Sequence, residues 1–411
     1  MSDAPVLRPA PTGAAARLAA LAMEHVDAAF AAARAVWPIP RLGAAALVTR
    51  YDDVREALLA DDCFAAPYGP KLDVIMGGEA FFLGMGDTPA YRRDTAAMRE
   101  VVRAGDIAPR LTGSVARAAA AVVDGAPGRI EVVDALARKV TFEVLCDYFG
   151  VRDPPDADMR VVATRLFEFQ FADPTNDPAL RRDVDVMAPL LRRHLDATIA
   201  ARRRVGSAID DVLGRCLDRA ASGAPGFSDV EIRTGLIGLI VGGLPQPPMV
   251  VPQALDQLLR RPDALAGAAA AAAADDDALL AGHVFEALRF DPLAPALMRA
   301  VVRDRTIAAG TGRATALKAG SSLLVSTRSA MRDPRRIRDP GHFDPRRPAH
   351  DYLHFGYGLH TCFAMAINRA VLPLMLKPLL LRPGLRRAPG AAGRLSKRGA
   401  FADSLTVDWD V

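Results

Sequence analysis

The sequence predicts a mainly α-helical protein with small β-sheets, and three observations support this fold class. Long helical patterns dominate residues 90–288, and a proline- and glycine-rich, strand-poor region follows to about residue 350. The 411 residues are half apolar, which is ample for one sizeable core. We therefore expect one domain over residues 41–411, with residues 1–40 as an extension that ends in a helix and packs on it.

Shorter elements flank the helical region. Residues 44–50 indicate a short strand, residues 52–60 indicate a helix, and a last helix is expected to start near Cys362. Residues 264–274 are rich in alanine, the best helix former, and predict a surface helix. The arginine run 202–204 falls in a predicted helix and indicates a solvated face.

Composition excludes several classes of protein. The N-terminal residues include an acidic residue and prolines where a secretory signal needs a basic and then an apolar segment. The most apolar stretch, residues 235–251, is interrupted by Gln246 and three prolines, so we expect no membrane span and a cytoplasmic protein. The 52 basic and 48 acidic residues nearly balance, which does not favour nucleic-acid binding. Four scattered cysteines indicate neither a disulfide framework nor a zinc ribbon.

One predicted helix is unusually well marked. Ser228 and Glu231 form a capping box, and the apolar run that follows continues to about residue 259. A helix of that length spans about 45–50 Å, the width of a domain, and we expect it at the centre of the fold. Prolines interrupt it, each at about 3 kcal/mol in a regular helix, so the sequence predicts a functional site there. These prolines are Pro245, Pro247, Pro248 and Pro252.

A second site is predicted by a glycine-rich loop around one cysteine. Residues 355–364, FGYGLHTCFA, stand directly before a helical stretch. Gly356 and Gly358 permit the positive backbone angles of a tight loop and the close approach of a flat ligand. The start of a helix favours the thiolate form of Cys362. A thiolate held in this way can ligate iron and push electron density toward its opposite face, which favours O–O bond cleavage.

This loop resembles the cysteine signature of the cytochrome P450 superfamily, FGxGxHxCxG. The matching residues are Phe355, Gly356, Gly358, His360 and Cys362, and Ala364 replaces the usual final glycine. The resemblance implies the cytochrome P450 fold of the bacterial soluble type. It also implies haem b (iron protoporphyrin IX) as cofactor, with Cys362 as the ligand of the iron and Phe355 and Gly356 beside the haem.

Other segments extend the resemblance over most of the chain. Glu286 and Arg289 match the ExxR helix of the family, where they would form a buried structural pair. FDPRR at 343–347 resembles the meander, in which Arg346 would complete the network. MRDP at 331–334 and LVTRYDDVREAL near 47–58 resemble two further family segments.

The resemblance also implies which residues hold the haem propionates. Arg299 falls where the family places a propionate-binding arginine, and His360 would bind the other propionate. A third contact, usually written HxxxR, is altered here to Tyr91 and Thr95. Tyr91 would then donate a hydrogen bond, and the missing positive charge would come from Arg92, Arg93 or Arg99.

The central helix departs from the family pattern. Oxygen-activating members carry a glycine-rich notch followed by an acid and an alcohol that deliver protons. In the matching segment, VGGLPQPP, Gly242 and Gly243 supply the notch, but Pro245 and Gln246 replace the acid and the alcohol. Proline has no proton to give and an amide does not ionise near neutral pH, so the usual proton relay is absent.

Three functions remain open. In the first, the oxidant is hydrogen peroxide, or an organic hydroperoxide that the enzyme rearranges or dehydrates, and Gln246 orients it. In the second, a conventional dioxygen- and NAD(P)H-dependent monooxygenase receives protons through water, substrate hydroxyls or carbonyls unpaired by the prolines, such as those of Val241, Gly243 and Leu244. In the third, the haem serves in binding, sensing or electron transfer. Alternatively, Gln246 only fills a gap among the prolines.

The expected substrate pocket is apolar, which suits a small lipid-like, terpenoid or aromatic substrate. Its lining residues would be Phe81, Phe82, Leu83, Leu239, Leu244, Leu293, Ala294 and Leu297, under a roof of Phe167, Phe169 and Phe171. No segment resembles a flavin or iron–sulfur domain, so electrons would come from a separate protein such as a ferredoxin. Arg346, Arg347 and Arg369 would meet that partner.

Overall fold

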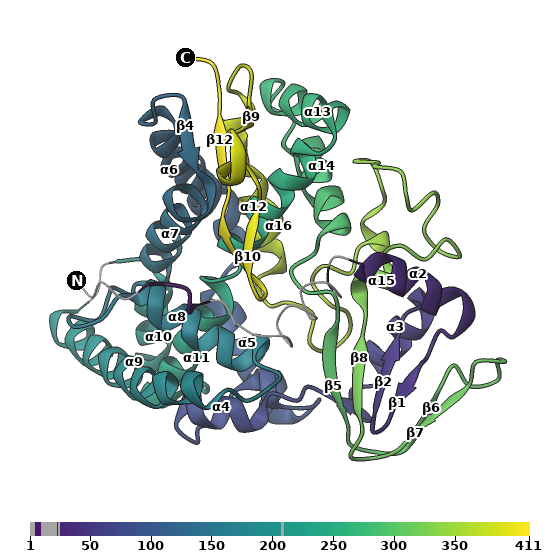
Figure 1. Cartoon of the computed structure of the whole chain (residues 1–411). Coiled ribbons are helices and arrows are strands. Elements are labelled where there is room, and N and C mark those ends of the chain that lie inside the picture. The colour runs from purple at the N-terminus through teal and green to yellow at the C-terminus, as the bar shows by residue number, and fades with distance from the viewer. Residues whose placement is uncertain (1–4, 10–22, 24, 207–208) are drawn as a thin grey trace.

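The structure, a computed structural model, describes residues 5–9, 23, 25–206 and 209–411. Part of the expected N-terminal extension, residues 1–40, therefore lies outside the described residues. The extension does contain a helix, α2 (Val26–Val36), which ends just before the WPIP segment. Figure 1 shows a mostly helical protein with small sheets, so the predicted fold class is confirmed.

Helices make up most of the chain. The longer ones are α3 (Tyr51–Leu59), α4 (Gly69–Met76), α5 (Pro89–Val101), α6 (Gly113–Asp124), α7 (Lys139–Phe149), α8 (Met159–Phe167), α9 (Pro178–Val205), α10 (Val212–Ala221), α11 (Asp229–Gly243), α12 (Pro247–Leu259), α13 (Pro262–Ala273), α14 (Asp277–Phe290) and α16 (Met365–Leu380). A short α15 (Thr327–Ala330) lies beside α3, and a π-helical turn, η5 (Glu168–Ala172), follows α8. The alanine-rich helix α13 buries one face, including Ala268, rather than lying wholly on the surface.

The region after α14 is richer in strands than the sequence indicated, and that prediction is wrong. A five-stranded sheet has the order β1-β2-β8-β5-β3. Its strands are β1 (Arg41–Leu42), β2 (Ala45–Val48), β3 (Phe64–Ala65), β5 (Leu297–Val301) and β8 (Ser322–Val325), and β6 (Arg305–Ile307) pairs with β7 (Thr315–Leu317). These strands have at most five residues, too few for a clear alternation of apolar and polar positions.

Strands also follow the last helix. β9 (Arg386–Arg387) and β4 (Arg129–Glu131) both pair with β12 (Thr406–Asp408), and β10 (Ser396–Arg398) pairs with β11 (Phe401–Ser404). The last helix begins at Met365, three residues after the predicted start at Cys362. Cys362 therefore lies in the turn that leads into α16.

The central helix is present and is broken once. The predicted capping box of Ser228 and Glu231 starts α11, which ends at Gly243, and α12 begins at Pro247. Pro247 and Pro248 lie in the first turn of α12, where a missing N–H is tolerated, and Pro252 does not end this helix. Residues 229–259 together are long and apolar enough to cross a membrane, but 78% of their most apolar window is buried inside the protein.

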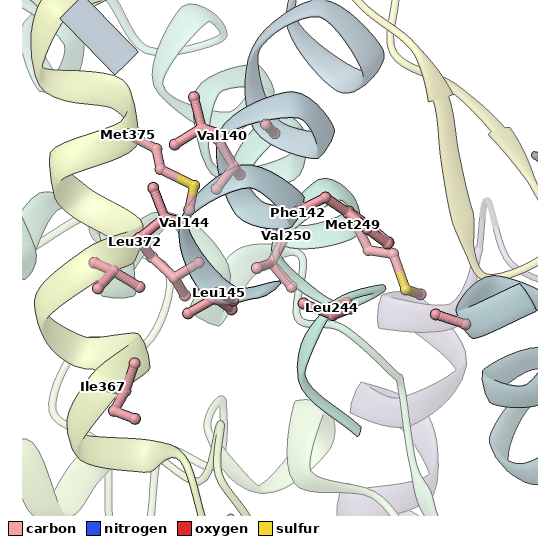
Figure 2. Close-up of a cluster of buried hydrophobic side chains, with 14 of the residues drawn as sticks. Val140, Phe142, Val144, Leu145, Leu244, Met249, Val250, Ile367, Leu372 and Met375 are labelled. Carbon is pink, nitrogen blue, oxygen red and sulfur yellow. The ribbon is translucent and has the colours of Figure 1, made fainter. Parts of the chain in front are cut away.

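The main core lies between α7, α12, α14 and α16. Figure 2 shows side chains of α7, α12 and α16 gathered in one cluster, among them Val140, Leu145, Val250 and Leu372. Leu244, at the break of the central helix, points into the same cluster. The core thus fixes the position of the break relative to α16, the helix that follows the cysteine loop.

Candidate active site at the cysteine loop

The cysteine loop is held in one tight conformation by its own backbone. Gly356 and Gly358 have φ of 72° and 77°, a region that favours glycine. A Cβ added at Gly358 would lie 2.5 Å from the carbonyl oxygen of Leu58, so this glycine is also required by close packing on α3. The N–H of Cys362 donates to the carbonyl of Phe355 at 2.8 Å, which closes the loop.

The Cys362 sulfur lies in a partly buried position with one stabilising donor. Burial raises the pKa of the thiol, and a hydrogen bond from the Ala364 backbone lowers it in part. Within the protein alone, burial thus favours the thiol. A bound metal cation would reverse this preference, because a coordinated thiol loses its proton.

Arg299 is a buried cation without a carboxylate partner among the described residues. It is 4% exposed, and burial lowers the pKa of its guanidinium. Its Nη1 donates to the carbonyl of Met298 at 3.1 Å, whereas its Nε has no hydrogen-bond partner. A buried guanidinium in this state requires an anion, and a haem propionate would supply it.

His360 and Tyr91 meet at the same loop. The two ring centroids lie 5.8 Å apart, and the Tyr91 hydroxyl donates to the carbonyl of Leu359 at 2.6 Å. Burial and the nearby Arg299 lower the pKa of His360 to about 4, so its imidazole is neutral at neutral pH and retains one N–H to donate. Thr95 instead donates to the carbonyl of Tyr91 within α5.

Arg92, Arg93 and Arg99 of α5 were expected to supply the positive charge that the altered HxxxR motif lacks, and they differ in their partners. Arg92 pairs with Asp87 at 2.8 Å, and Arg93 pairs with Asp94 at 2.7 Å. The Arg99 guanidinium lies 5.0 Å from the centroid of Phe363, the residue after Cys362. Arg99 is thus the one of the three placed beside the cysteine loop.

Glu286 and Arg289 form a fully buried ion pair on α14. Arg289 donates to Glu286 through Nε at 2.9 Å and Nη2 at 2.7 Å, and both side chains are 0% exposed. Arg289 also donates to the carbonyls of Met331, Pro340 and His342. The pair thereby fastens the segment after α15 to α14.

The third member of this network is Arg347, which corrects the expectation for Arg346. Arg347 is buried and donates to Glu286 Oε1 at 3.1 Å, and the Tyr352 hydroxyl donates to Oε2 at 3.0 Å. Arg346 is exposed. Arg346 and Arg347 lie in one short irregular segment, where no helix or strand periodicity predicts which side chain is buried. Arg347 is also too buried to meet a partner protein.

One stripe of residues on the central helix is partly accessible to solvent. Partly buried positions recur four apart, while the residues between them are buried, so the stripe occupies one face of the helix. A Cβ added at Gly242 would meet nothing within 4 Å, so the helix borders open space there. The stripe consists of Gly238, Leu239, Gly242, Gly243 and Gln246.

Leu244 is not part of this stripe, contrary to the expectation that it lines the pocket. It is 0% exposed and lies in the core cluster of Figure 2. Leu239 and Leu244 are five residues apart, which places them about 140° apart around a helix. The other expected lining residues are all partly buried: Phe81, Phe82, Leu83, Leu239, Leu293, Ala294 and Leu297.

Four residues near the site were not predicted from the sequence. Tyr68 and Asp61 lie close enough to Arg299 to influence its pKa, and Asp61 Oδ1 has no hydrogen-bond partner. His354, directly before Phe355, bonds through Nε2 to the carbonyl of Phe285 at 2.9 Å. The ring of Phe81 packs against Gly238. In the sequence, the four-residue spacing between Gly238 and Gly242 could have indicated that Gly238 lies on the same helix face.

Comparison with known proteins gives a consistent result. Residues 278–386, which hold the Glu–Arg pair and the cysteine loop, match the cytochrome P450 family model. Cyclomarin C epoxidase CymV of Salinispora arenicola is 28% identical over 86% of this chain and 89% of that protein. A bifunctional dioxygenase–epoxy alcohol synthase of Fusarium oxysporum is 32% identical over 49% of this chain, but the match spans only 16% of the fungal protein. The ligand-free structure of cytochrome P450 TbtJ1 superimposes with a TM-score of 0.78, at 22% identity, over 94% of this chain and 98% of that one.

Haem-thiolate oxidoreductases have a fold of this kind, in which helices surround a cysteine loop and a buried Glu–Arg pair supports that loop. The family match, the epoxidase relative and the shared fold then identify the chain more closely. Residues 278–386 match the cytochrome P450 superfamily, and the chain has the fold of a solved P450. The family match implies a haem cofactor, and the unpaired Arg299 Nε and the open space beside Gly242 fit such a group.

Proposed function

We propose that this P450 uses an oxidant that is already at the peroxide level, either hydrogen peroxide or an organic hydroperoxide, to oxidise a small apolar substrate in the cytoplasm. The observation that carries the proposal is the accessible stripe of the central helix. It ends in Gln246, directly after Pro245, where the family places an alcohol and an acid. Residues 234–255 contain no ionisable side chain at all.

The proposed haem site uses residues of the cysteine loop and its surroundings. Cys362 would ligate the haem iron, and Arg299 and His360 would bind the propionates, with Phe355 and Gly356 against the ring. Tyr91 would join them only if its hydroxyl turned from the Leu359 carbonyl to a propionate. When bound, a thiolate-ligated haem supplies O–O bond cleavage and oxygen transfer. The Glu286–Arg289 pair supports the loop from below and does not touch substrate.

The break in the central helix offers acceptors rather than acids. The carbonyls of Val241, Gly243 and Leu244 each have a proline four residues on, so none receives the regular helix hydrogen bond. Gln246 adds one amide that both donates and accepts. These groups bind and orient an O–H donor such as a peroxide, but they supply no proton of their own.

The stoichiometry of each reaction explains why the lack of a proton donor matters. Conversion of a C–H bond to C–OH with dioxygen also yields water, and it consumes two electrons and two protons. With hydrogen peroxide, the substrate and the peroxide together already contain every atom and electron of the alcohol and the water. A site without a proton donor therefore suits a peroxide better than dioxygen.

An organic hydroperoxide receives separate support from the Fusarium relative, which is named as a dioxygenase and an epoxy alcohol synthase. An epoxy alcohol has the same atoms as an unsaturated hydroperoxide, so its formation needs no external electrons. The half-buried apolar side chains of Phe81, Phe82, Leu239, Leu293 and Leu297 would accommodate a lipid-like, terpenoid or aromatic substrate.

A conventional dioxygen- and NAD(P)H-dependent monooxygenase is the second candidate. A relative of Streptomyces venezuelae that is named a cytochrome P450 monooxygenase favours it, with 26% identity over 82% of this chain and 77% of that protein. Protons would then pass through water or substrate hydroxyls at the free carbonyls of the break. A separate ferredoxin would supply electrons, and the exposed Arg346 and Arg369 would meet its acidic surface.

Turnover with alternative oxidants separates the two candidates. The purified haem protein is given styrene with hydrogen peroxide, linoleic acid hydroperoxide alone, or styrene with NADPH, ferredoxin and ferredoxin reductase. The proposal expects product in the first or second reaction and little in the third. Product only in the third reaction would overturn it.

A further inference from the structure

A short N-terminal segment lies across the turn that leads from α8 to α9. Figure 1 shows residues 5–9, in purple, beside α8. Leu7 is 7% exposed and belongs to the main hydrophobic core. The segment is therefore packed into the protein and not merely laid on its surface.

Three arginines fasten the segment. Arg165 of α8, itself 5% exposed, donates to the carbonyls of Val6 at 2.6 Å and Pro5 at 3.0 Å. In return, Arg8 pairs with Glu168 of η5 at 3.5 Å and with Asp177, the residue that caps α9. On its other side, Arg398 of β10 donates to the carbonyl of Arg8 at 3.4 Å. The segment thus connects α8, η5, the start of α9 and the β10–β11 hairpin.

The connected turn reaches the haem site through aromatic side chains. Phe171 of η5 lies 5.0 Å from Tyr68, which is close enough to Arg299 to influence its pKa. Phe167 lies 4.9 Å from Phe171 and 5.9 Å from Phe401 of β11. The turn therefore spans from the propionate-binding region to the hairpin that the N-terminal segment also contacts.

The middle of the turn is held from α4. Lys71 donates to the carbonyl of Asp173 at 2.6 Å and approaches its carboxylate at 3.4 Å. The middle of the turn is thus fixed by a partly buried charge from α4, and its two ends are fixed by Arg8. The second attachment comes from the N-terminal segment 5–9.

We propose that residues 5–9 form a latch that holds the 168–177 turn closed over the substrate side of the haem site, so that its release admits bulky molecules. The latch has a hydrophobic part, Leu7, and an electrostatic part, Arg8. Because Arg8 and its two acidic partners are still 20–34% exposed, added salt weakens the electrostatic part. The proposal concerns access alone and holds for either oxidant.

Ligand entry kinetics test the latch with the haem-loaded protein. Imidazole and 4-phenylimidazole both bind haem iron and are followed by stopped-flow absorbance, and only the second needs a wide entry. In Arg8→Glu, and in a variant lacking residues 2–9, we expect roughly five- to ten-fold faster association of 4-phenylimidazole, from the loss of partly buried ion pairs. Imidazole association should change little. Arg8→Lys should restore most of the wild-type rate.

The control is Arg129→Glu, which removes an ion pair with Asp408 at 2.7 Å in a distant sheet. It should leave both association rates unchanged. Amide hydrogen exchange, also measured on the apoprotein, should speed up in residues 165–178 for the latch variants and not for the control. Unchanged exchange and unchanged 4-phenylimidazole association in the variant lacking residues 2–9 would overturn the proposal. Equal acceleration of both ligands would overturn it too.

Discussion

The ring of Phe81 packs directly against Gly238 of the central helix. A Cβ added at Gly238 would lie 2.1 Å from Phe81 Cζ, closer than any two such atoms can approach. Phe81 in turn packs on Phe82 at 4.2 Å between ring centroids, and Phe82 lies 5.8 Å from Phe363, beside Cys362. An aromatic chain therefore links the accessible stripe of α11 to the cysteine loop.

A double-mutant cycle tests this contact. Gly238→Ala should destabilise the protein by about 1–3 kcal/mol through overpacking, and Phe81→Ala should remove most of that effect in the double variant. Chemical denaturation measures the coupling. Gly312→Ala is the control, because a Cβ there would meet nothing within 4 Å, and it should behave like wild type. Additive effects of Gly238→Ala and Phe81→Ala would show that the two residues do not touch.

The two neighbouring arginines of the meander should differ sharply. Arg347→Ala leaves a fully buried Glu286 with one partner fewer, and breaking such a network costs about 3–5 kcal/mol. Arg346→Ala removes an exposed side chain and should change stability by no more than about 0.5 kcal/mol. Denaturation midpoints and haem content of the two variants check this. Equal losses in both would contradict the assigned network.

His354 should make the protein less stable in acid. Burial lowers the pKa of His354 from its ordinary 6.5 to about 4. As pH falls from 6.5 toward 4, the unfolded chain binds the proton first, so stability is present above pH 6.5 and is lost through this window. In His354→Gln, whose amide can still donate to Phe285, the free energy of unfolding should depend less steeply on pH.

The exposed His350 provides the matched control for this pH dependence. Its side chain is 80% exposed, so His350→Gln controls for the removal of an imidazole that is not buried. If His354→Gln and His350→Gln give the same slope as wild type, the buried neutral imidazole is not a source of acid sensitivity.

Gln246 should matter for peroxide-driven turnover. If it orients the oxidant, Gln246→Ala should lower the rate more than about ten-fold, equivalent to about 1.4 kcal/mol of barrier, with haem content retained. The double change Pro245→Glu and Gln246→Thr restores the acid and alcohol of the family and should raise NADPH-driven turnover. A packing role for Gln246 predicts only a small loss with peroxide.

Sequence reasoning located features with a fixed spacing and missed those that depend on the path of irregular chain. The capping box at Ser228, the break near Pro245 and the mainly helical fold follow from local patterns, and the structure has them. Arg347, Leu244 and the strands after α14 were misjudged, because orientation in short strands and loops is set by distant packing. The turn after α8 and its contact with Arg8 join residues too far apart in sequence for any spacing to predict them.

The most direct measurement of the central claim is the absorption spectrum of the reduced protein under carbon monoxide, for wild type and Cys362→Ser. We expect the long-wavelength Soret band of a thiolate-ligated haem in wild type and its loss in the variant. A spectrum of that kind that persists in Cys362→Ser, or a wild-type protein that binds no haem, would contradict the account.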